Sequence, residues 1–583
     1  MLSQSCFNLK YINTRSACRK LSRILIALSF TALAIAQFGT GEMSGLLTDG
    51  SGAALPNAEV KVTNQATKIS TVLLTDNQGR YTGLALPAGR YSLEVKISGF
   101  KAYTRSDIEL VTGSRIAQNL TLELGSVTEV IEVTASSAQV EVLSATVGKV
   151  VEGRMFRDIP LNGRNLTSIM LLKAGVSSTG APNSFRPTGD ARSYTIHGSR
   201  ATDAYLSTDG VAMTGGRNNL RGPSNISVDA IAEANILTSN YSAEYPRAGG
   251  GQVQFITKSG TSAFHGALYE YLRNDAFDAR SFQRGTKQKL RYNQFGFAIG
   301  GPMYWPGKVN TNREKLFFFA NMEWIRRREE RLDTSVVPTV RERQGDFNGS
   351  TLFPCPRVSG GTALYPNCTI PANVLSPNGL ALSSLYPLPN AAEAVFNYRG
   401  VSPAINSFRS HTGRVDYNLT RHRFFWRGTY HSDLNKGERP TNFPNPPSRS
   451  EQNGGSTGFT VASTIAPTLL NSFRAGASFQ FLGNSFSAAG KDTSDYFRSK
   501  SGINYPYLFG NDKEAAEKVP TLIVARLGTL DGGSFPLRFA TPTYQVQNDL
   551  TWIKGAHTFK VGGGDCPRWC ASFASRRSAR ADR

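Results

Sequence analysis

Apolar and polar residues alternate along short segments for most of the 583-residue chain, and clusters of Gly, Asn, Asp and Ser separate these segments. Val60 and Val62 alternate with polar neighbours, and so do Leu93, Val95 and Ile97. A period of two places one face of each strand in a core. Val, Thr, Phe and Tyr favour strands, and no long stretch has the pattern of a helix. The sequence therefore predicts a mainly β protein.

The first predicted domain covers residues 41–125 and is a small β-sandwich. The turn signals "DNQG" at 76–79 and "PAG" at 87–89 supply the backbone angles that tight turns need. The phrases "MSGLLTDGSGAALPNAEVKVTN" and "TDNQGRYTGLALPAGRYSLEVKISGF" resemble the carboxypeptidase-regulatory-like (transthyretin-like) domain. That domain accompanies carboxypeptidases without being their catalytic part, and related sandwiches bind carbohydrate. We therefore expect an accessory domain without peptidase activity.

Amphipathic strands dominate from residue 251 onward, and about nine of them resemble the strands of an outer-membrane barrel. Segments such as "FHGALYEYLRN" and "TLLNSFRAGASFQFL" alternate, and aromatic residues gather near strand ends, as in the girdles at membrane interfaces. A soluble sandwich shows the same alternation, so the barrel prediction depends on the domain before it. We predict the N-terminal part of a transmembrane antiparallel β-barrel, left incomplete, over 251–564.

Residues 139–250 combine short strands with short helical pieces and predict a small α+β domain. The phrases "DIPLNGRNL", "IHGSR" and "VDAIAEANILTSNYSAEYPRAGGG" resemble, in this order, the plug domain of TonB-dependent outer-membrane receptors of the Oar-like subgroup. The next segment, "GQVQFIT" at 251–257, is then either the last plug strand or the first barrel strand. The resemblance implies that plug loops bind the ligand, and the candidate residues are His197, Gly198, Arg200, Asp209 and Arg217.

An extended, β-prone segment and a small polar linker occupy residues 126–138, between sandwich and plug. Taken alone, the segment is one more strand. In this position it resembles a TonB box, which is a free segment that adds as a strand to the energy-coupling protein TonB. The TonB-box-like residues are Thr128, Glu129, Val130, Ile131, Glu132, Val133, Thr134 and Ala135. The resemblance implies TonB, with its energising inner-membrane complex, as a partner.

Residues 1–36 are predicted to be a signal peptide, with a membrane anchor as the alternative. Basic residues precede an apolar run, 24–36, which is too short to span a bilayer and ends in a small-x-small cleavage pattern. No later segment is apolar enough for a membrane-spanning helix, so a membrane location requires a β-barrel. Export makes anionic lipid or lipopolysaccharide, and not nucleic acid, the expected partner of the +22 formal charge. We expect an outer-membrane protein whose sandwich lies in the periplasm.

Cys355 and Cys368 bracket a short loop, and an oxidising compartment favours a disulfide between them. Receptors of the resembled family close with about 22 strands, and an open barrel leaves unpaired edges in lipid. Residues 565–583 are rich in Arg and Ser and show no alternation. We therefore expect a truncated copy with a frameshifted tail, or alternatively a natural disordered tail.

No motif indicates an enzyme, a metal site or a cofactor. The histidines form no HExxH motif, and His422 and His431 are expected at the surface of a basic strand. The segment "GGSTG" at 454–458 formally matches a serine-hydrolase elbow but lacks the helix that must follow it. The leading hypothesis is a TonB-dependent receptor or transporter for an extracellular ligand such as an oligosaccharide, an iron chelate or a peptide. The alternative is an exported carbohydrate-binding or adhesive β-sandwich protein.

Overall fold

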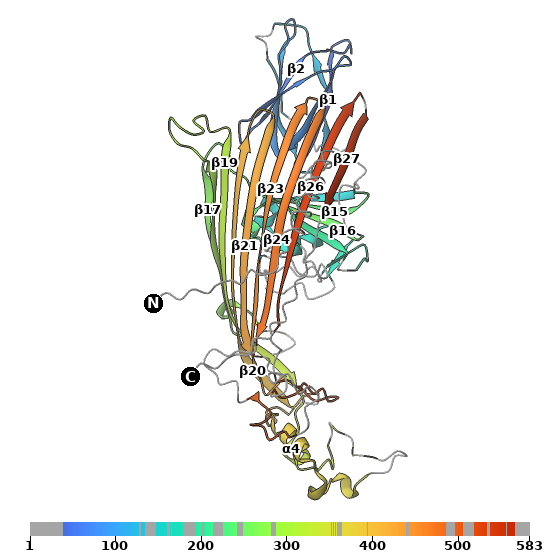
Figure 1. Ribbon diagram of the computed structural model, residues 1–583, viewed down its shortest axis with the longest axis vertical. Helices are drawn as coiled ribbons and strands as arrows, with labels where there is room; N and C mark the ends of the chain where they lie inside the picture. Colours follow the sequence, from blue (N-terminus) through green and yellow to red (C-terminus); the bar gives the residue numbers. More distant parts are fainter. Residues whose placement is uncertain are drawn as a thin grey trace, which may run out of the picture.

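The computed structural model describes residues 39–126, 130–134, 147–159, 164, 166–178, 194–200, 203–213, 226–241, 249–280, 287–350, 353, 355, 357, 364–392, 395–438, 442–485, 496–504, 518–532, 537–555 and 557–565. This part of the chain is mainly β, which confirms the predicted fold class (Figure 1). A sandwich lies at one end of a long curved wall of strands, and a smaller sheet, the plug, lies against the wall. No helix among the described residues is long and apolar enough to cross a membrane.

The sandwich consists of two sheets around one apolar core. The first sheet pairs β4 (Arg80–Pro87), β1 (Thr40–Asp49), β7 (Arg115–Ala117) and β8 (Leu120–Leu122). The second has the order β3 (Ser70–Leu74), β2 (Glu59–Asn64), β5 (Gly89–Val95), β6 (Ala102–Leu110) and β9 (Val130–Thr134). The alternating residues Val60, Val62, Leu93 and Val95 are fully buried in this core, and Ile97 packs against it. The period of two therefore identified the inner face of these strands.

The plug is a mixed five-stranded sheet in the order β10 (Val147–Glu152), β15 (Ile231–Ser239), β16 (Gly251–Thr257), β13 (Ala204–Thr208) and β14 (Val211–Ala212). Short elements flank it: α2 (Gly153–Asp158), the 3₁₀ helices η2 (Leu166–Leu172) and η4 (Val228–Ala230), and the hairpin of β11 (Val176–Ser178) and β12 (Tyr194–Ile196). Its core also takes in Ala298 and Phe319 of the wall. The plug and the wall therefore share one apolar cluster.

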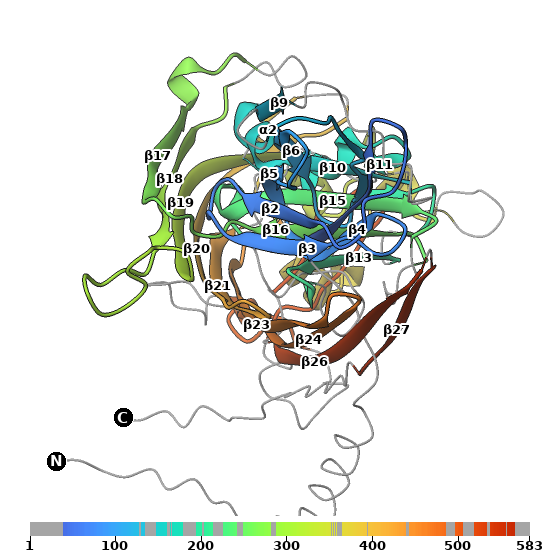
Figure 2. The same cartoon turned by 90° about the horizontal axis from the view of Figure 1, so that it is seen from above.

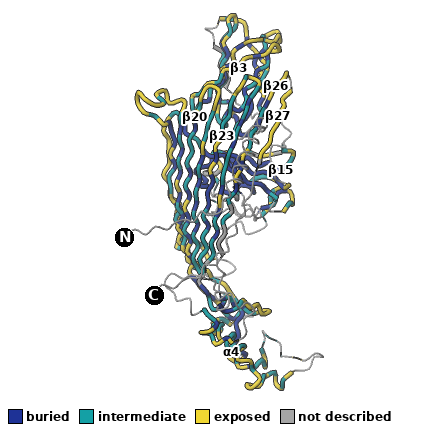
Figure 3. Tube along the Cα trace, in the orientation of Figure 1, coloured by how far each residue is buried: buried dark blue, intermediate teal, exposed yellow. Residues whose placement is uncertain are grey.

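The wall is an antiparallel sheet of nine strands among the described residues. Their order follows the sequence: β17 (His265–Asn274), β18 (Leu290–Pro302), β19 (Leu316–Ser335), β20 (Tyr398–Asn418), β21 (His422–Glu438), β23 (Pro447–Ala466), β24 (Leu469–Ser485), β26 (Leu537–Lys554) and β27 (His557–Asp565). Buried and exposed residues alternate along these strands because one face lines the interior (Figure 3). In the described part the wall does not close on itself: seen from above, it is an open arc around the plug, with the sandwich over the plug (Figure 2).

The structure decides two details of the predicted barrel. The segment Gly251–Thr257, predicted as either the last plug strand or the first barrel strand, pairs with β15 and β13 and is a plug strand. The alternating segment 411–433 contains parts of two strands, β20 and β21, because the chain turns back between Asn418 and His422. The predicted number of wall strands therefore matches, although its members differ.

The two ends of the wall differ in their connections. At the sandwich end, short turns at 419–421 and 467–468 join neighbouring strands, and residues 303–315 join β18 to β19. At the far end, β19 and β20 are joined by residues 336–397, which hold α3 (Val340–Arg343), the 3₁₀ helices η6 (Pro366–Cys368) and η7 (Ala372–Val374), and α4 (Pro377–Ser384). Near it, β22 (Asn442–Phe443) pairs with β25 (Thr529–Leu530). The 3₁₀ helix η5 (Asp275–Phe277) follows β17. The connection between β19 and β20 therefore lies at the end away from the sandwich (Figure 1).

Candidate functional site

The turn between β13 and β14 presents a buried carboxylate to the wall. Asp209 has a left-handed φ of 44°, and Gly210, which follows it, has a φ of 81°. The backbone N–H of Asp209 donates to the carbonyl of Phe255 at 2.9 Å. Its carboxylate accepts from the backbone N–H of Thr257 at 3.0 Å and from the Thr257 hydroxyl at 2.7 Å. Strand β16 therefore fixes both the turn and its acidic side chain.

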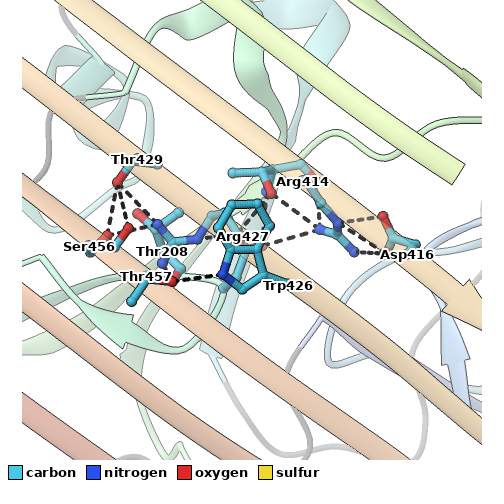
Figure 4. A network of polar contacts seen from close by, with 10 residues as sticks. Thr208, Arg414, Asp416, Trp426, Arg427, Thr429, Ser456 and Thr457 are labelled. Carbon is cyan, nitrogen blue, oxygen red and sulfur yellow. Dashed lines mark hydrogen bonds and ion pairs between the residues drawn. The ribbon is translucent and has the colours of Figure 1, made fainter.

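Two wall arginines meet this carboxylate. The Arg427 Nε lies 3.1 Å from Oδ2 of Asp209, and the Arg414 Nη1 lies 3.5 Å from Oδ1. Arg414 also pairs with Asp416 on its own strand at 2.8 Å (Figure 4). Ser259 donates to the carboxylate of Asp416 at 2.8 Å. Buried ion pairs thus join the plug to the wall. Because these charges are shielded from water, each one is stabilised only by its protein partners.

Arg427 is fully buried and has neutral partners as well. It donates to the carbonyl of Thr208 at 3.1 Å, to the hydroxyl of Ser456 at 2.7 Å and to that of Thr429 at 3.2 Å (Figure 4). Ser456 belongs to the "GGSTG" segment, which lies inside strand β23 with no turn or following helix. This serine therefore orients an arginine and has none of the surroundings of a hydrolase nucleophile.

The tip of the plug turn is seated on two glycines of the wall. Gly458 and Gly476 face each other across β23 and β24. A Cβ added at either position would lie 2.7 Å from the Cγ2 of Val211. Gln545 clasps the same turn, since its side chain donates to the carbonyl of Gly210 at 2.8 Å and accepts from the N–H of Ala212 at 3.3 Å. Only glycine therefore permits this close approach of plug and wall.

A second cluster joins the other side of the plug to the wall. The Arg164 guanidinium lies 2.9 Å from Asp229 of η4 and 4.0 Å from Glu323 of β19. It also lies 4.1 Å above the ring of Tyr271. Ser227 donates to Glu323 at 2.8 Å. The arginine of the plug motif "PLNGRNL" is therefore a buried link to the wall.

The sandwich is attached at three places. Arg423 of β21 donates to the carbonyl of Ala85 at 2.6 Å and to the Thr71 hydroxyl at 3.2 Å. Ser262, on the link from plug to wall, donates to the carbonyl of Ala66 through its side chain at 3.0 Å and its N–H at 3.2 Å. These contacts hold the sandwich to the wall and to the link. The third place is on the plug itself.

Glu233 of β15 forms the contact between plug and sandwich. Its carboxyl oxygen accepts from the backbone N–H of Thr112 at 3.0 Å, and Asn235 donates to the carbonyl of Thr112 at 3.3 Å. Burial raises the pKa of Glu233 to about 7, against the opposing effect of the Thr112 hydrogen bonds and with a further contribution from Glu109 and Glu152. The charge of this interface therefore changes near neutral pH.

The predicted ligand-contacting residues do not lie together in one site. His197, Gly198 and Arg200 lie in and after the exposed turn that follows β12. Asp209 is buried and engaged by Arg427, Arg414 and Thr257, so the structure does not support its predicted contact with a ligand. Arg217 lies outside the described residues.

The TonB-box-like segment is only partly described. Val130–Thr134 forms β9, which pairs in parallel with β6 at the edge of the sandwich. Thr128, Glu129 and Ala135 lie outside the described residues, as do the predicted signal peptide over 1–36 and the tail residues after Asp565. The prediction that this segment is extended agrees with β9, whereas the expectation that it is free does not.

Two further predictions concern the wall and its long connection. Cys355 and Cys368, which the sequence pairs, form a disulfide with their Cα atoms 5.2 Å apart. His431, expected at the surface, is buried on the inner face of β21 and stacks with Phe408. The physical reason is the register of β21. His431 is four residues from Arg427, so both side chains point to the inner face of the wall, which the plug and neighbouring side chains cover. His422 is exposed, as expected.

A polar pocket lies on the inner face of the wall toward its far end. Side chains that are direct cross-strand neighbours line it in one row: Arg327, Asn406, Asn435, Ser450 and Asn484. Glu329 and Arg331 line it as well and pair with each other at 3.5 Å. The pocket is on the side of the plug opposite to the sandwich, and its lining combines amide and hydroxyl groups with several basic side chains, among them Lys436 and Arg449.

A curved antiparallel wall with a plug sheet locked to its inner face defines the class of plugged outer-membrane β-barrels. The family described as outer membrane beta barrel domain matches residues 256–569, more than half of the chain, and the chain belongs to this family. The carboxypeptidase regulatory-like domain matches residues 42–123. Membership of the barrel family places the chain in the outer membrane.

The chain is also similar to individual proteins. It is 27% identical over 278 residues to the TonB-dependent transporter Oar of Myxococcus xanthus, a match that covers 46% of this chain and 25% of Oar. Solved structures similar to it are the outer membrane transporter YddB from Escherichia coli (10% identity, TM-score 0.43, 72% of this chain and 47% of that chain) and the siderophore receptor PirA from Acinetobacter baumannii (14%, 0.41, 73% and 48%). The chain therefore spans about a quarter of Oar and about half of these structures. The matches confirm the predicted resemblance to Oar-like receptors, and they name barrels and transporters, which fits a protein that is not an enzyme.

Proposed function

We propose that this chain belongs to a TonB-dependent receptor that moves an extracellular ligand across the outer membrane. The observation that carries the proposal is the plug, which is held inside the wall by buried ion pairs and not by an apolar interface alone. Ion pairs of this kind can break and re-form, because water hydrates the separated charges when the plug moves. The similarity to Oar supports the same conclusion.

The ends of the wall give the orientation that we propose. Barrels of this class have short turns on the periplasmic side and long loops outside. The short turns lie at the sandwich end, so the sandwich is periplasmic, and the polar pocket faces outward. The ligand then meets the outer loops, the pocket and the exposed turn with His197, Gly198 and Arg200. Lipopolysaccharide surrounds the outer end of the wall in this proposal, and the polar lining of the pocket suits a hydrophilic ligand such as an oligosaccharide.

The energy for transport comes, in this proposal, from TonB and its inner-membrane complex. TonB adds as a strand to the segment 128–135 and pulls on it, and the plug, which follows it in the chain, rearranges. Strand addition uses backbone groups, so Ile131→Pro, which removes a backbone donor, should abolish crosslinking to TonB. Ile131→Val, which keeps the backbone, is the matched control. Crosslinking that persists in Ile131→Pro and in a chain lacking 128–135 would refute this assignment.

Fractionation separates this function from an exported adhesive sandwich. We expect the chain in the outer-membrane fraction, with a heat-modifiable shift on gels that is typical of a folded barrel. Recovery in a soluble periplasmic or secreted fraction without such a shift would exclude the receptor and favour the adhesive protein.

A further inference from the structure

The edge of the sandwich binds a strand from the same chain. Strand β6 pairs with β5 in antiparallel on one side and with β9 in parallel on the other. The register joins Ala102 to Val130 and Ser106 to Thr134. Within the described residues no further strand pairs with β9, so it is the outermost strand of its sheet. The edge of β6 is therefore a strand-binding surface that β9 occupies.

The pairing is short, and its end has a structural cause. Immediately after Ser106, Asp107 has a left-handed φ of 57°, and the pairing of β6 with β5 shifts register in the same region. Such a bulge bends the strand and disrupts the ladder. Only the five residues of β9 are held, in the parallel arrangement that is slightly less stable per residue. A strand of this kind detaches more readily than the antiparallel core of the sandwich.

Residues Val130–Thr134 lie within the segment proposed as the TonB box. We propose that the sandwich and the energy-coupling partner compete for this one strand, so that the sandwich withholds the segment until β9 leaves β6. The inference rests on the proposed function and adds the regulation of the same site.

The attachments of the sandwich explain why detachment must precede pulling. The sandwich is fixed to the wall by Arg423, to the link by Ser262 and to the plug by Glu233. While β9 is paired, force applied to it is borne by β6 and passes through these attachments to the wall. Once β9 has left β6, the same force reaches the plug sheet directly.

A disulfide across β6 and β9 tests the proposal in the full chain. Tyr103 packs on the sandwich core, so its neighbour Thr104 points to the other face, and Thr104 is the direct backbone neighbour of Glu132 across the two strands. Adjacent strands lie about 4.8 Å apart, which suits a disulfide in Thr104→Cys/Glu132→Cys. The matched control is Lys61→Cys/Glu94→Cys, which joins the direct neighbours of β2 and β5 and leaves β9 untouched.

The measurement is the affinity of the purified periplasmic domain of TonB for each detergent-solubilised chain, oxidised and reduced. We expect oxidation to weaken binding by at least about tenfold in the Thr104→Cys/Glu132→Cys chain, reduction to restore it, and the control pair to bind equally in both states. Equal binding by the oxidised and reduced test chains would overturn the competition, and so would failure of the disulfide to form.

A synthetic peptide of residues 126–138 distinguishes the assignment of the TonB box from its storage on the sandwich. If the peptide binds the TonB domain and the cross-linked chain binds as well as the reduced chain, storage on the sandwich is wrong and the box assignment stands. If the peptide does not bind, the assignment of the box fails, and the competition fails with it. Binding by the peptide that is tighter than binding by the reduced full chain would support storage directly.

Discussion

The carboxylate of Asp209 gives the sharpest test of how the plug is held. Asp209→Asn keeps the size of the side chain and its ability to accept the N–H of Thr257, but it removes the negative charge. Arg414 still has Asp416 at 2.8 Å. Arg427 keeps only neutral partners, among them the carbonyl of Thr208 and the hydroxyl of Ser456.

The magnitude follows from the burial of Arg427, which is fully shielded from solvent. Removing one partner of a buried pair costs about 3–5 kcal/mol, because the remaining charge stays uncompensated. Since neutral hydrogen bonds remain, we take the lower end. Docking of the plug should weaken by about 3 kcal/mol, so the undocked population should rise about a hundredfold.

Hydrogen exchange of the β13 and β16 amides in the detergent-solubilised chain measures this opening. Asp49→Asn, at an exposed turn of the sandwich, is the control and should leave these amides unchanged. The double variant Asp209→Asn/Arg427→Met should recover most of the loss, since it removes the buried charge together with its partner. If Asp209→Asn exchanges like the control, or if the double variant is worse than the single one, the ion pair does not hold the plug.

Three more predictions follow from the contacts of the plug and the sandwich. Gly476→Val should displace the Val211 turn, because even a Cβ would lie 2.7 Å from it, and faster exchange of β14 without loss of the heat-modifiable gel shift would show this. The sandwich should dock more firmly as the pH falls, because the pKa of Glu233 is raised to about 7 in the docked state. The contribution of protonated Glu233 to docking is complete below the ordinary pKa of 4.5 and is lost as the pH rises through 7. The effect is at most about 3 kcal/mol, and proteolytic release of 39–126 from pH 5 to 8 should lose this pH dependence in Glu233→Gln. Arg423→Ala should release the sandwich more readily at every pH, as it removes two hydrogen bonds worth about 1 kcal/mol each; release at the rate of the unaltered chain would show that this contact is dispensable.

Local patterns explain what could be predicted. The inward face of the sandwich strands follows from alternation over a few residues, as the burial of Val60 and Leu93 shows. Strand β16 shows the limit of the same signal. Its sequence alternates Gln252 and Gln254 with apolar residues, yet both glutamines are buried. Alternation states that a strand has two different faces, but not which surface covers each of them.

The charged residues that join the plug to the wall could not be predicted from the sequence pattern. Arg414 and Arg427 lie in strands that carry many basic residues, and nothing local distinguishes them from their exposed neighbours Arg409 and Arg421. Both arginines lie on the inward-facing side of their strands, and the register of β20 and β21 makes them direct neighbours. Their side chains therefore reach the turn at Thr208 and Asp209, about two hundred residues earlier in the chain. The need for glycine at 458 and 476 was equally unpredictable, because it follows only from the close approach of Val211 to both positions.

The sequence by itself determined the strands, the turns and the resemblances of sandwich, plug and wall, because each of these depends on residues that are close together in the sequence. Only the tertiary structure decided that Gly251–Thr257 belongs to the plug, that Asp209 holds the plug to the wall, and that Val130–Thr134 rests on the sandwich. These outcomes depend on which distant segment supplies the second half of a hydrogen bond or ion pair. A buried backbone edge or charge must be satisfied by some partner, and the fold alone chooses which one.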